Sequence, residues 1–300
     1  MYFLRRLLGS WYDNQTIKLI AEILFVILPL AFAIRTFIFG FYQVPTGSME
    51  TTLLVGERFL ADKLTYWFRK PDYKEIIAFD EPKYNYSKNP VVNLWQRYVS
   101  WNVTNWTKRV IGKPGDHIKG IIENGQPVVY LNGKKLDESA YVNKYPLIKV
   151  WKSNRDLTLA REASRESYHS FLQIFSDRTD SRSYDPEKPL DQQPFYKIKP
   201  NLLVRQEDGS PVETWPGTKI SNDIFDVKLG DNEYWVMGDN RLGSSDSRFW
   251  GPLDGKLIHG RIIYRIWSMD SENSWLLPDL LNPIGFLKKV RFSRCFNWVY

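Results

Sequence analysis

Cysteine and histidine are scarce in this 300-residue chain, and their scarcity removes several kinds of chemistry. The single cysteine, Cys295, cannot form an intramolecular disulfide. The three histidines, His117, His169 and His259, lie far apart, and no cysteine or glutamate stands near them at the spacing that metal sites use. The sequence therefore predicts neither a disulfide nor a metal site.

The sequence also lacks the usual signs of a histidine-dependent hydrolase. There is no Gly-x-Ser-x-Gly segment, and no histidine stands in a context that suggests a catalytic triad. A serine nucleophile in this chain would need a different base, because a serine hydroxyl alone is a weak nucleophile.

Charge and composition narrow the class of protein only a little. The net charge of +7 and the pI of about 9.2 suit an anionic membrane surface and nucleic acid equally well. The basic residues are scattered and no nucleic-acid-binding module accompanies them, so we expect no nucleic-acid partner. A hydrophobic fraction of 43% is ample for a packed core.

One long apolar run lies near the N-terminus, over residues 18–41 (KLIAEILFVILPLAFAIRTFIFGF). The run is longer than the about 20 mostly apolar residues that a helix needs to cross a bilayer. Its charges Glu22 and Arg35 lie toward its two ends, and Pro29 is expected to kink the helix without ending it. The run predicts a transmembrane anchor. Two alternatives remain. The run could be a cleaved signal peptide, although no small-x-small cleavage site follows it closely, or it could be a buried core helix.

Basic residues set the expected orientation of this anchor. Arg5, Arg6 and Lys18 precede or open the run, so the positive-inside rule places residues 1–17 in the cytoplasm. Everything after about residue 42 is then expected on the outer side of the membrane.

Beyond the anchor the pattern changes to short strands and turns. Residues 58–66 alternate in part, and residues 234–237 and 261–267 are β-branched and aromatic runs typical of buried strands. Asn132-Gly133 between two apolar runs predicts a hairpin. We therefore expect a mainly β catalytic domain of antiparallel sheets, preceded by one transmembrane helix.

The expected domain organisation follows from these patterns. A catalytic β core is predicted over residues 42–136 and 224–268, with a smaller insertion at 71–105. Residues 137–223 are long, polar and dotted with proline, with a helical pattern at 157–175, and are predicted as an inserted second domain. The tail at 269–300 mixes basic and aromatic residues; it either packs on the domain or rests on a membrane interface.

Three segments concentrate residues that can carry chemistry. Val44-Pro45-Thr46-Gly47-Ser48-Met49 follows the anchor, and Pro45 and Gly47 favour a turn that exposes a hydroxyl. Residues 108–116 read KRVIGKPGD, and residues 238–251 read GDNRLGSSDSRFWG. Each segment alone is compatible with an ordinary turn or solvated charges. The third is the densest polar cluster in the chain.

Together these segments resemble the conserved boxes of bacterial type I signal peptidases, the leader peptidase family. The resemblance also takes in the anchor, the Asn132–Lys134 hairpin and the strand at 260–267, whereas residues 71–105, 137–223 and 270–300 match loosely or not at all. It implies a serine endopeptidase without metal or organic cofactor. Thr51, Thr107 and Lys113 depart from the family's usual residues and are expected to affect substrate preference.

The resemblance implies a role for each matching residue. Ser48 is implied as the nucleophile and Lys108 as the general base. The Ser48 N–H and the Thr46 hydroxyl are implied as the oxyanion hole. Ser244 is implied to hydrogen-bond and orient the Lys108 nitrogen. Asp246 and Arg248 are implied as a supporting ion pair with Asp239 and Arg241 beside it, and the implied pocket for small side chains is lined by Tyr42, Val44, Leu53 and Thr107.

The implied lysine base sets a physical requirement. Lowering a lysine pKa from about 10.4 to about 8 takes roughly 3 kcal/mol of destabilisation of the charged form. Burial supplies such a shift if no carboxylate pairs with the ammonium. Trp106, Val110 and Ile111 offer apolar surroundings for Lys108, and Arg248 is a suitable partner to occupy Asp246.

The resemblance implies a monomeric, single-pass enzyme of the bacterial cytoplasmic membrane. It would cleave signal peptides from exported preproteins after small residues on the outer side, with preproteins and the phospholipid bilayer as partners. One alternative is a self-cleaving repressor-type serine–lysine protease, which would need a soluble DNA-binding module in place of the anchor. Another is a membrane-tethered scaffold, although both reacting residues are present.

Overall fold

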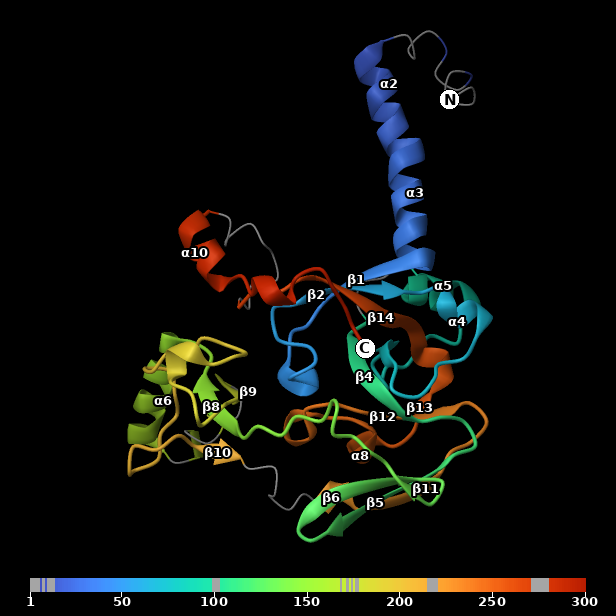
Figure 1. Cartoon of the computed structure of the whole chain (residues 1–300). Coiled ribbons are helices and arrows are strands. Elements are labelled where there is room, and N and C mark those ends of the chain that lie inside the picture. The colour runs from blue at the N-terminus through green and yellow to red at the C-terminus, as the bar shows by residue number, and fades with distance from the viewer. Residues whose placement is uncertain are drawn as a thin grey trace.

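The computed structural model describes most of the chain: residues 14–98, 103–167, 178–214, 221–270 and 281–300, with single residues at 6, 9, 169, 170, 173 and 175. In this part, a long N-terminal helix stands on a large antiparallel sheet, with two smaller sheets beside it (Figure 1).

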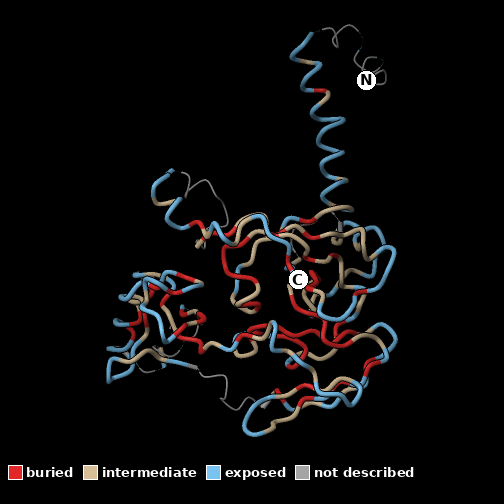
Figure 2. The backbone as a smooth tube through the Cα atoms, in the orientation of Figure 1, coloured by how far each residue is buried: buried red, intermediate tan, exposed pale blue. Residues whose placement is uncertain are grey.

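The N-terminal helix runs without a break from Gln15 to Ile38. Asn14 caps it, because its side-chain oxygen accepts from the backbone N–H groups of Thr16 and Ile17. It consists of four stretches: α2 (Gln15–Glu22), η2 (Ile23–Ile27), α3 (Leu28–Ala33) and η3 (Ile34–Ile38). The helix projects from the protein with its apolar side chains exposed (Figure 2), as expected for a segment that lipid surrounds.

The helix ends three residues earlier than the predicted limit of the anchor. Residues Phe39–Gln43 form strand β1, which pairs in antiparallel register with β2 (Arg58–Asp62). Glycine is a poor helix residue, and aromatic neighbours favour a strand. Gly40 also leaves room for the Tyr42 ring, since a Cβ there would lie 2.3 Å from it.

The large sheet forms the centre of the predicted β core, and every pairing in it is antiparallel. Its strand order is β1, β2, β14 (Ile258–Trp267), β3 (Ile76–Asp80), β4 (Asn105–Gly112), β12 (Glu233–Met237) and β13 (Leu253–Asp254), and β15 (Asn297–Trp298) pairs with β14. The predicted antiparallel, mainly β fold is confirmed. The order places the N-terminal strand β2 beside the C-terminal strand β14, and β3 and β4 follow next to β14.

Both faces of the central strand β3 are buried. Ile76 and Ala78 belong to one core cluster with Met49. Ile77 and Phe79 belong to a second cluster on the other face. The alternation follows from the two-residue period of a strand, and it gives β3 a rigid position beside β4.

A second sheet carries the predicted hairpin. Its order is β11 (Phe225–Lys228), β5 (His117–Glu123), β6 (Gln126–Leu131) and β7 (Lys134–Lys135). Asn132 and Gly133 join β6 to β7 with φ angles of 50° and 79°. Two positive φ angles suit an Asn-Gly hairpin turn, so this prediction is confirmed.

The third sheet lies within the predicted insertion at 137–223. Its order is β10 (Glu213–Thr214), β8 (Leu147–Trp151) and β9 (Thr179–Ser183), with α6 (Asn154–Glu166) beside it (Figure 1). Ser153 caps α6 by accepting from the Asp156 N–H, so the helix begins at Asn154, three residues before the start of the predicted helical pattern. Several residues of that pattern beyond 166 lie outside the described ranges.

Short helices complete the described chain. The predicted strand at 58–66 ends at Asp62, because the Asp62 carboxylate accepts from the N–H groups of Leu64 and Thr65 and starts a helix. The short helices are α4 (Thr65–Phe68), α5 (Pro90–Tyr98), α8 (Ser247–Trp250), α10 (Pro283–Lys289), η4 (Gly47–Met49), η5 (Leu190–Gln192), η6 (Ser221–Asp223), η7 (Arg241–Gly243), η8 (Gly255–Leu257) and η9 (Phe292–Arg294).

The C-terminal tail packs on the domain, which is one of its two predicted arrangements; contact with a membrane interface stays a prediction. Phe286 of α10 stacks on Trp267 at 5.7 Å between ring centroids. Leu281, Ile284 and Leu287 remain exposed beside it. The tail is therefore packed on the domain and still presents an apolar surface.

Candidate active site

The turn that carries Ser48 is held from the opposite side by Asn240. Ser48 lies in η4, directly after β1, and Met49 anchors the turn in the core with 1% exposure. The Asn240 N–H donates to the Ser48 carbonyl at 3.1 Å, and its side-chain amide donates to the Gly47 carbonyl at 2.9 Å. Sequence analysis gave Asn240 no role, although it lies in the densest polar segment.

The tertiary structure brings Lys108 to Ser48, although 60 residues separate them in sequence. Lys108 lies on β4, and its Nζ donates to Ser48 Oγ at 2.9 Å and to the Thr107 carbonyl at 3.1 Å. The side chain is 5% exposed. A lysine at this distance can take the serine proton when it is neutral.

Burial makes that neutral form accessible. It lowers the pKa of Lys108 to about 8, and this effect outweighs the opposite influence of Asp246 and Asp239. The Trp106 ring lies beside the amine, with Nζ 5.7 Å from the ring centroid. About half of the lysine is therefore neutral at pH 8, as a general base requires.

Asp246 stays close to Lys108 without pairing with it, because Arg248 occupies its carboxylate. Arg248 Nε and Nη2 donate to the two Asp246 oxygens at 2.9 and 3.0 Å. The Gly238 N–H donates to the same carboxylate at 2.9 Å, and Arg248 reaches Asp223 at 2.6 Å. The ion pair implied by the sequence resemblance is therefore present and buried.

Asp239 and Arg241 have different partners from one another. Asp239 accepts two hydrogen bonds from Arg109, at 2.8 and 2.7 Å, and one from Thr52 at 2.5 Å. It thus links the segment after Ser48 to the residue after Lys108. Arg241 donates to Glu138 at 2.9 and 2.5 Å, so it ties the polar loop to the start of the insertion.

The hydrogen bond implied between Ser244 and Lys108 is not formed. Ser244 is buried, and its side chain lies close enough to the Asp246 carboxylate to help hold the pKa of that group below its usual value. Lys108 instead directs its amine to Ser48 and to its own strand. Ser244 still lies beside the nucleophile turn: a Cβ on Gly238 would be 2.2 Å from the Ser244 hydroxyl and 2.4 Å from the Ser48 carbonyl oxygen.

Comparison with known proteins decides the family. The family model described as "Signal peptidase, peptidase S26" matches residues 17–267. The chain belongs to the S26 signal peptidase family. Members of this family are serine endopeptidases, and with the apolar helix at its N-terminus this chain is a membrane-anchored one.

Individual relatives agree with this assignment. Signal peptidase I of Buchnera aphidicola subsp. Acyrthosiphon pisum is 27% identical over 286 residues, which cover 87% of this chain and 79% of the relative. Signal peptidase I of Aquifex aeolicus is 27% identical over 280 residues, covering 92% and 93%. A crystal structure of an Enterococcus faecalis signal peptidase I is 18% identical, covers 65% of this chain and 97% of its own, and has a TM-score of 0.26.

Within this signal peptidase, two hydrogen-bond donors of the turn that carries Ser48 have no partner in the described structure. Thr46 is exposed, and in the described structure neither its hydroxyl nor the Ser48 N–H takes part in a hydrogen bond. Both are therefore available to a substrate oxygen, as donors of an oxyanion hole must be.

The residues implied as a substrate pocket divide into two groups. Tyr42 and Val44 are half-buried and pack on the core cluster around Met49, and Thr107 is half-buried on β4. Leu53 was expected to line the pocket, but it is 1% exposed and belongs to that core cluster. It cannot form an open wall, because its side chain is covered by the turn and the sheet.

Glu50 is a residue of this signal peptidase that sequence analysis missed. It lies two residues after Ser48 and is fully buried. Its carboxylate accepts from the Ser183 N–H at 3.0 Å, from the Ser183 hydroxyl at 2.7 Å and from the Tyr196 hydroxyl. The only signal in the sequence is that Glu50 is the one charged residue between Arg35 and Glu57, since its partners lie more than 130 residues away.

Proposed function

We propose that this protein is a signal peptidase that removes signal peptides from exported preproteins after small residues, with Ser48 as nucleophile and Lys108 as general base. The observation that carries the proposal is the 2.9 Å contact between Ser48 Oγ and a buried lysine with a pKa of about 8. The contact lies in a chain that belongs to the signal peptidase family over most of its length.

The reaction follows from this geometry. Neutral Lys108 takes the proton of Ser48 as its oxygen attacks the scissile carbonyl carbon. The carbonyl oxygen becomes negative and is stabilised by the Ser48 N–H and the Thr46 hydroxyl. The lysine then gives its proton to the leaving amine, and an acyl-enzyme remains. Lys108 next deprotonates a water that hydrolyses the ester, and the proton returns to Ser48.

Two open strand edges suit an extended substrate. Among the described strands β1 pairs only with β2, and residues 105–108 of β4 pair only with β3. A peptide laid along these edges can add main-chain hydrogen bonds. Its small side chains would then face Tyr42, Val44 and Thr107, which leave little depth.

The short stretch of sequence between the anchor and Ser48 supports a reaction site at the membrane surface. Ser48 follows Ile38, the last helical residue, by only ten positions. Phe41, Trp67 and Phe68 are 70%, 64% and 85% exposed near the end of the helix, where aromatic side chains suit contact with the bilayer. One chain supplies every group of the proposed mechanism, consistent with a monomer.

The positive residues before the helix support a cytoplasmic N-terminus and an active site on the outer side of the bacterial cytoplasmic membrane. The orientation is tested with Lys134→Cys in a Cys295→Ser background, labelled in intact cells by a membrane-impermeant maleimide. Labelling without lysis supports the outer location, whereas labelling only after lysis contradicts it.

The catalytic assignment is tested by cleavage of a preprotein in detergent micelles. Ser48→Ala and Lys108→Ala should each lower the rate at least about a thousandfold. Matched controls are Ser164→Ala and Lys134→Ala, which change exposed residues far from the site in sequence. Full activity in either test variant would contradict the assignment of Ser48 and Lys108 as nucleophile and general base.

A further inference from the structure

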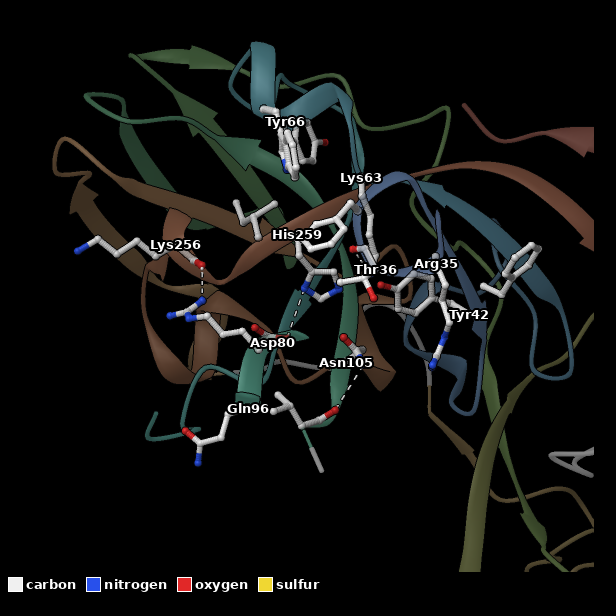
Figure 3. Close-up of a pocket in the computed structure, with 17 residues that line it drawn as sticks. Arg35, Thr36, Tyr42, Lys63, Tyr66, Asp80, Gln96, Asn105, Lys256 and His259 are labelled. Atoms are coloured by element: carbon white, nitrogen blue, oxygen red, sulfur yellow. Dashed lines mark hydrogen bonds and ion pairs between the residues drawn. The ribbon is translucent and has the colours of Figure 1, made fainter. Parts of the chain in front are cut away.

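A cavity of about 420 Å³ lies at the foot of the N-terminal helix. It is bounded by the end of the helix, β1, α4, α5, and the first residues of β4 and β14 (Figure 3). Its volume is within the range of about 300–1,000 Å³ in which proteins bind ligands. None of the proposed reacting residues lines it.

The cavity continues the proposed path of the substrate toward the membrane. It is lined by residues 40–42 of β1 and by Asn105 of β4, which are the two open edges described above. Asn105 precedes Lys108 by three residues, about 10 Å along a strand. An extended peptide with its scissile carbonyl at Ser48 therefore enters the cavity about three residues before that bond, and about the fourth to sixth residues before the bond lie within it.

The lining of the cavity is positively charged. Arg35, Lys63, Arg97 and Lys256 contribute four cations, against one carboxylate from Asp80. Lys63 and Lys256 form no ion pair within the described residues; Lys63 Nζ only donates to the Thr36 carbonyl, at 3.4 Å. Burial, followed by repulsion from Arg35, lowers the pKa of Lys63, as expected in a cationic surrounding.

The carboxylate of Asp80 already has partners. Tyr86 donates to it through its hydroxyl, and His259 Nδ1 lies 3.4 Å away (Figure 3). Burial raises the pKa of Asp80, but the hydrogen bonds from His259 and Tyr86 outweigh this and hold it below its usual value. Asp80 therefore stays ionised and engaged. Lys63 lines the cavity without an ion pair, whereas Lys256 lines its rim and extends its amine away from the other labelled residues (Figure 3).

We infer that this cavity is a subsite for the substrate segment four to six residues before the scissile bond, and that its charge selects against lysine and arginine there. Glutamate, aspartate or neutral polar side chains are accepted. The inference rests on the proposed function, because it needs the peptide to run along β1 and β4.

The alternative occupant is the headgroup of an anionic phospholipid, since the cavity also adjoins the end of the helix. The open strand edges on both sides favour the peptide, because a peptide can form main-chain hydrogen bonds along them and a lipid headgroup cannot form such a ladder. The two occupants make different predictions for substrate charge.

The test uses the full-length enzyme in detergent micelles and three preproteins that differ only in the fifth residue before the cleavage site: Glu, Gln or Lys. The wild type should cleave the Glu substrate with a higher kcat/KM than the Lys substrate. Lys63→Gln and Lys256→Gln together should reduce this ratio by about threefold or more, and Lys63→Glu should reduce it further. Lys134→Gln, which removes an exposed lysine from the hairpin, should leave the ratio unchanged.

Cleavage of the Gln substrate separates this inference from the proposed function. If wild type and variants cleave it alike while the Glu-to-Lys ratio changes, both ideas stand. An equal ratio in wild type and the double variant overturns the subsite, even with normal cleavage. The same experiment in phosphatidylglycerol and phosphatidylcholine vesicles identifies a lipid site. If the anionic lipid stimulates cleavage by the wild type but not by the double variant, and the charge preference for substrates is the same in both, the peptide subsite is overturned.

Discussion

The Glu50 carboxylate, two residues beyond Ser48, accepts two hydrogen bonds from Ser183, at 3.0 and 2.7 Å. Ser183 ends β9 in the predicted insertion, so this segment directly supports the turn of the nucleophile. The Asn143 N–H strengthens the connection by donating to the Asp239 carbonyl at 2.9 Å, and its side chain donates to the Ser183 hydroxyl at 2.8 Å. The described part of residues 137–223 thus contacts both the turn that carries Ser48 and the polar segment that begins at Gly238.

Replacing Glu50 should damage both stability and turnover. In Glu50→Ala the Ser183 and Tyr196 donors lose their buried acceptor, and each such group costs about 1–3 kcal/mol. We expect a clear fall in the thermal unfolding temperature and a lower kcat. Glu162→Ala, an exposed glutamate on α6, is the control. Unchanged stability and kcat in Glu50→Ala would show that the hydrogen bonds from Ser183 and Tyr196 to Glu50 do not support the turn that carries Ser48.

The pKa of Lys108 fixes the pH dependence of cleavage. Only the neutral amine acts as a base, so kcat/KM should rise with pH and level off above a midpoint of about 8. Well below that midpoint the rate should fall about tenfold per pH unit. The measurement is a pH–rate profile for one preprotein in micelles. A flat profile between about pH 6 and 9 is incompatible with this base.

Asp246 should tune that midpoint. Its negative charge is the largest influence that raises the pKa of Lys108, so Asp246→Asn should move the midpoint below 8. The variant also leaves Arg248 with a weaker buried partner, which should cost about 3–5 kcal/mol of unfolding free energy. Asp223→Asn is the matched control, since it removes another Arg248 partner and should leave the midpoint in place.

Asn240 should act through the position of Ser48. Asn240→Ala removes the hydrogen bond to the Gly47 carbonyl but keeps the backbone bond to Ser48. We expect kcat to fall about tenfold with little change in KM, the effect of losing about 1.4 kcal/mol of positioning. Asn201→Ala, an exposed asparagine, controls for the change in residue type. A rise in KM alone would place Asn240 in substrate binding instead.

Several features of this protein depend only on short stretches of its sequence. The apolar run, the Asn132-Gly133 hairpin and the β-rich segments were predictable, because hydrophobic period and turn chemistry act over a few residues. The helix limit at Ile38 was not, since pairing of β1 with β2 decides it. The Asp246–Arg248 pair was accessible because its members are two residues apart.

The contacts that depend on strand register needed the tertiary structure. The order of β3, β4 and β12 decides that Asp239 meets Arg109, and the sequence carries no mark of that pairing. Packing decides that Leu53 is buried and that Ser244 does not bond to Lys108. By itself the sequence determined the anchor, the β character of the domain and the residue types for a serine–lysine site. Only the fold set their distances and the pKa of the lysine, because both depend on burial among segments distant along the chain.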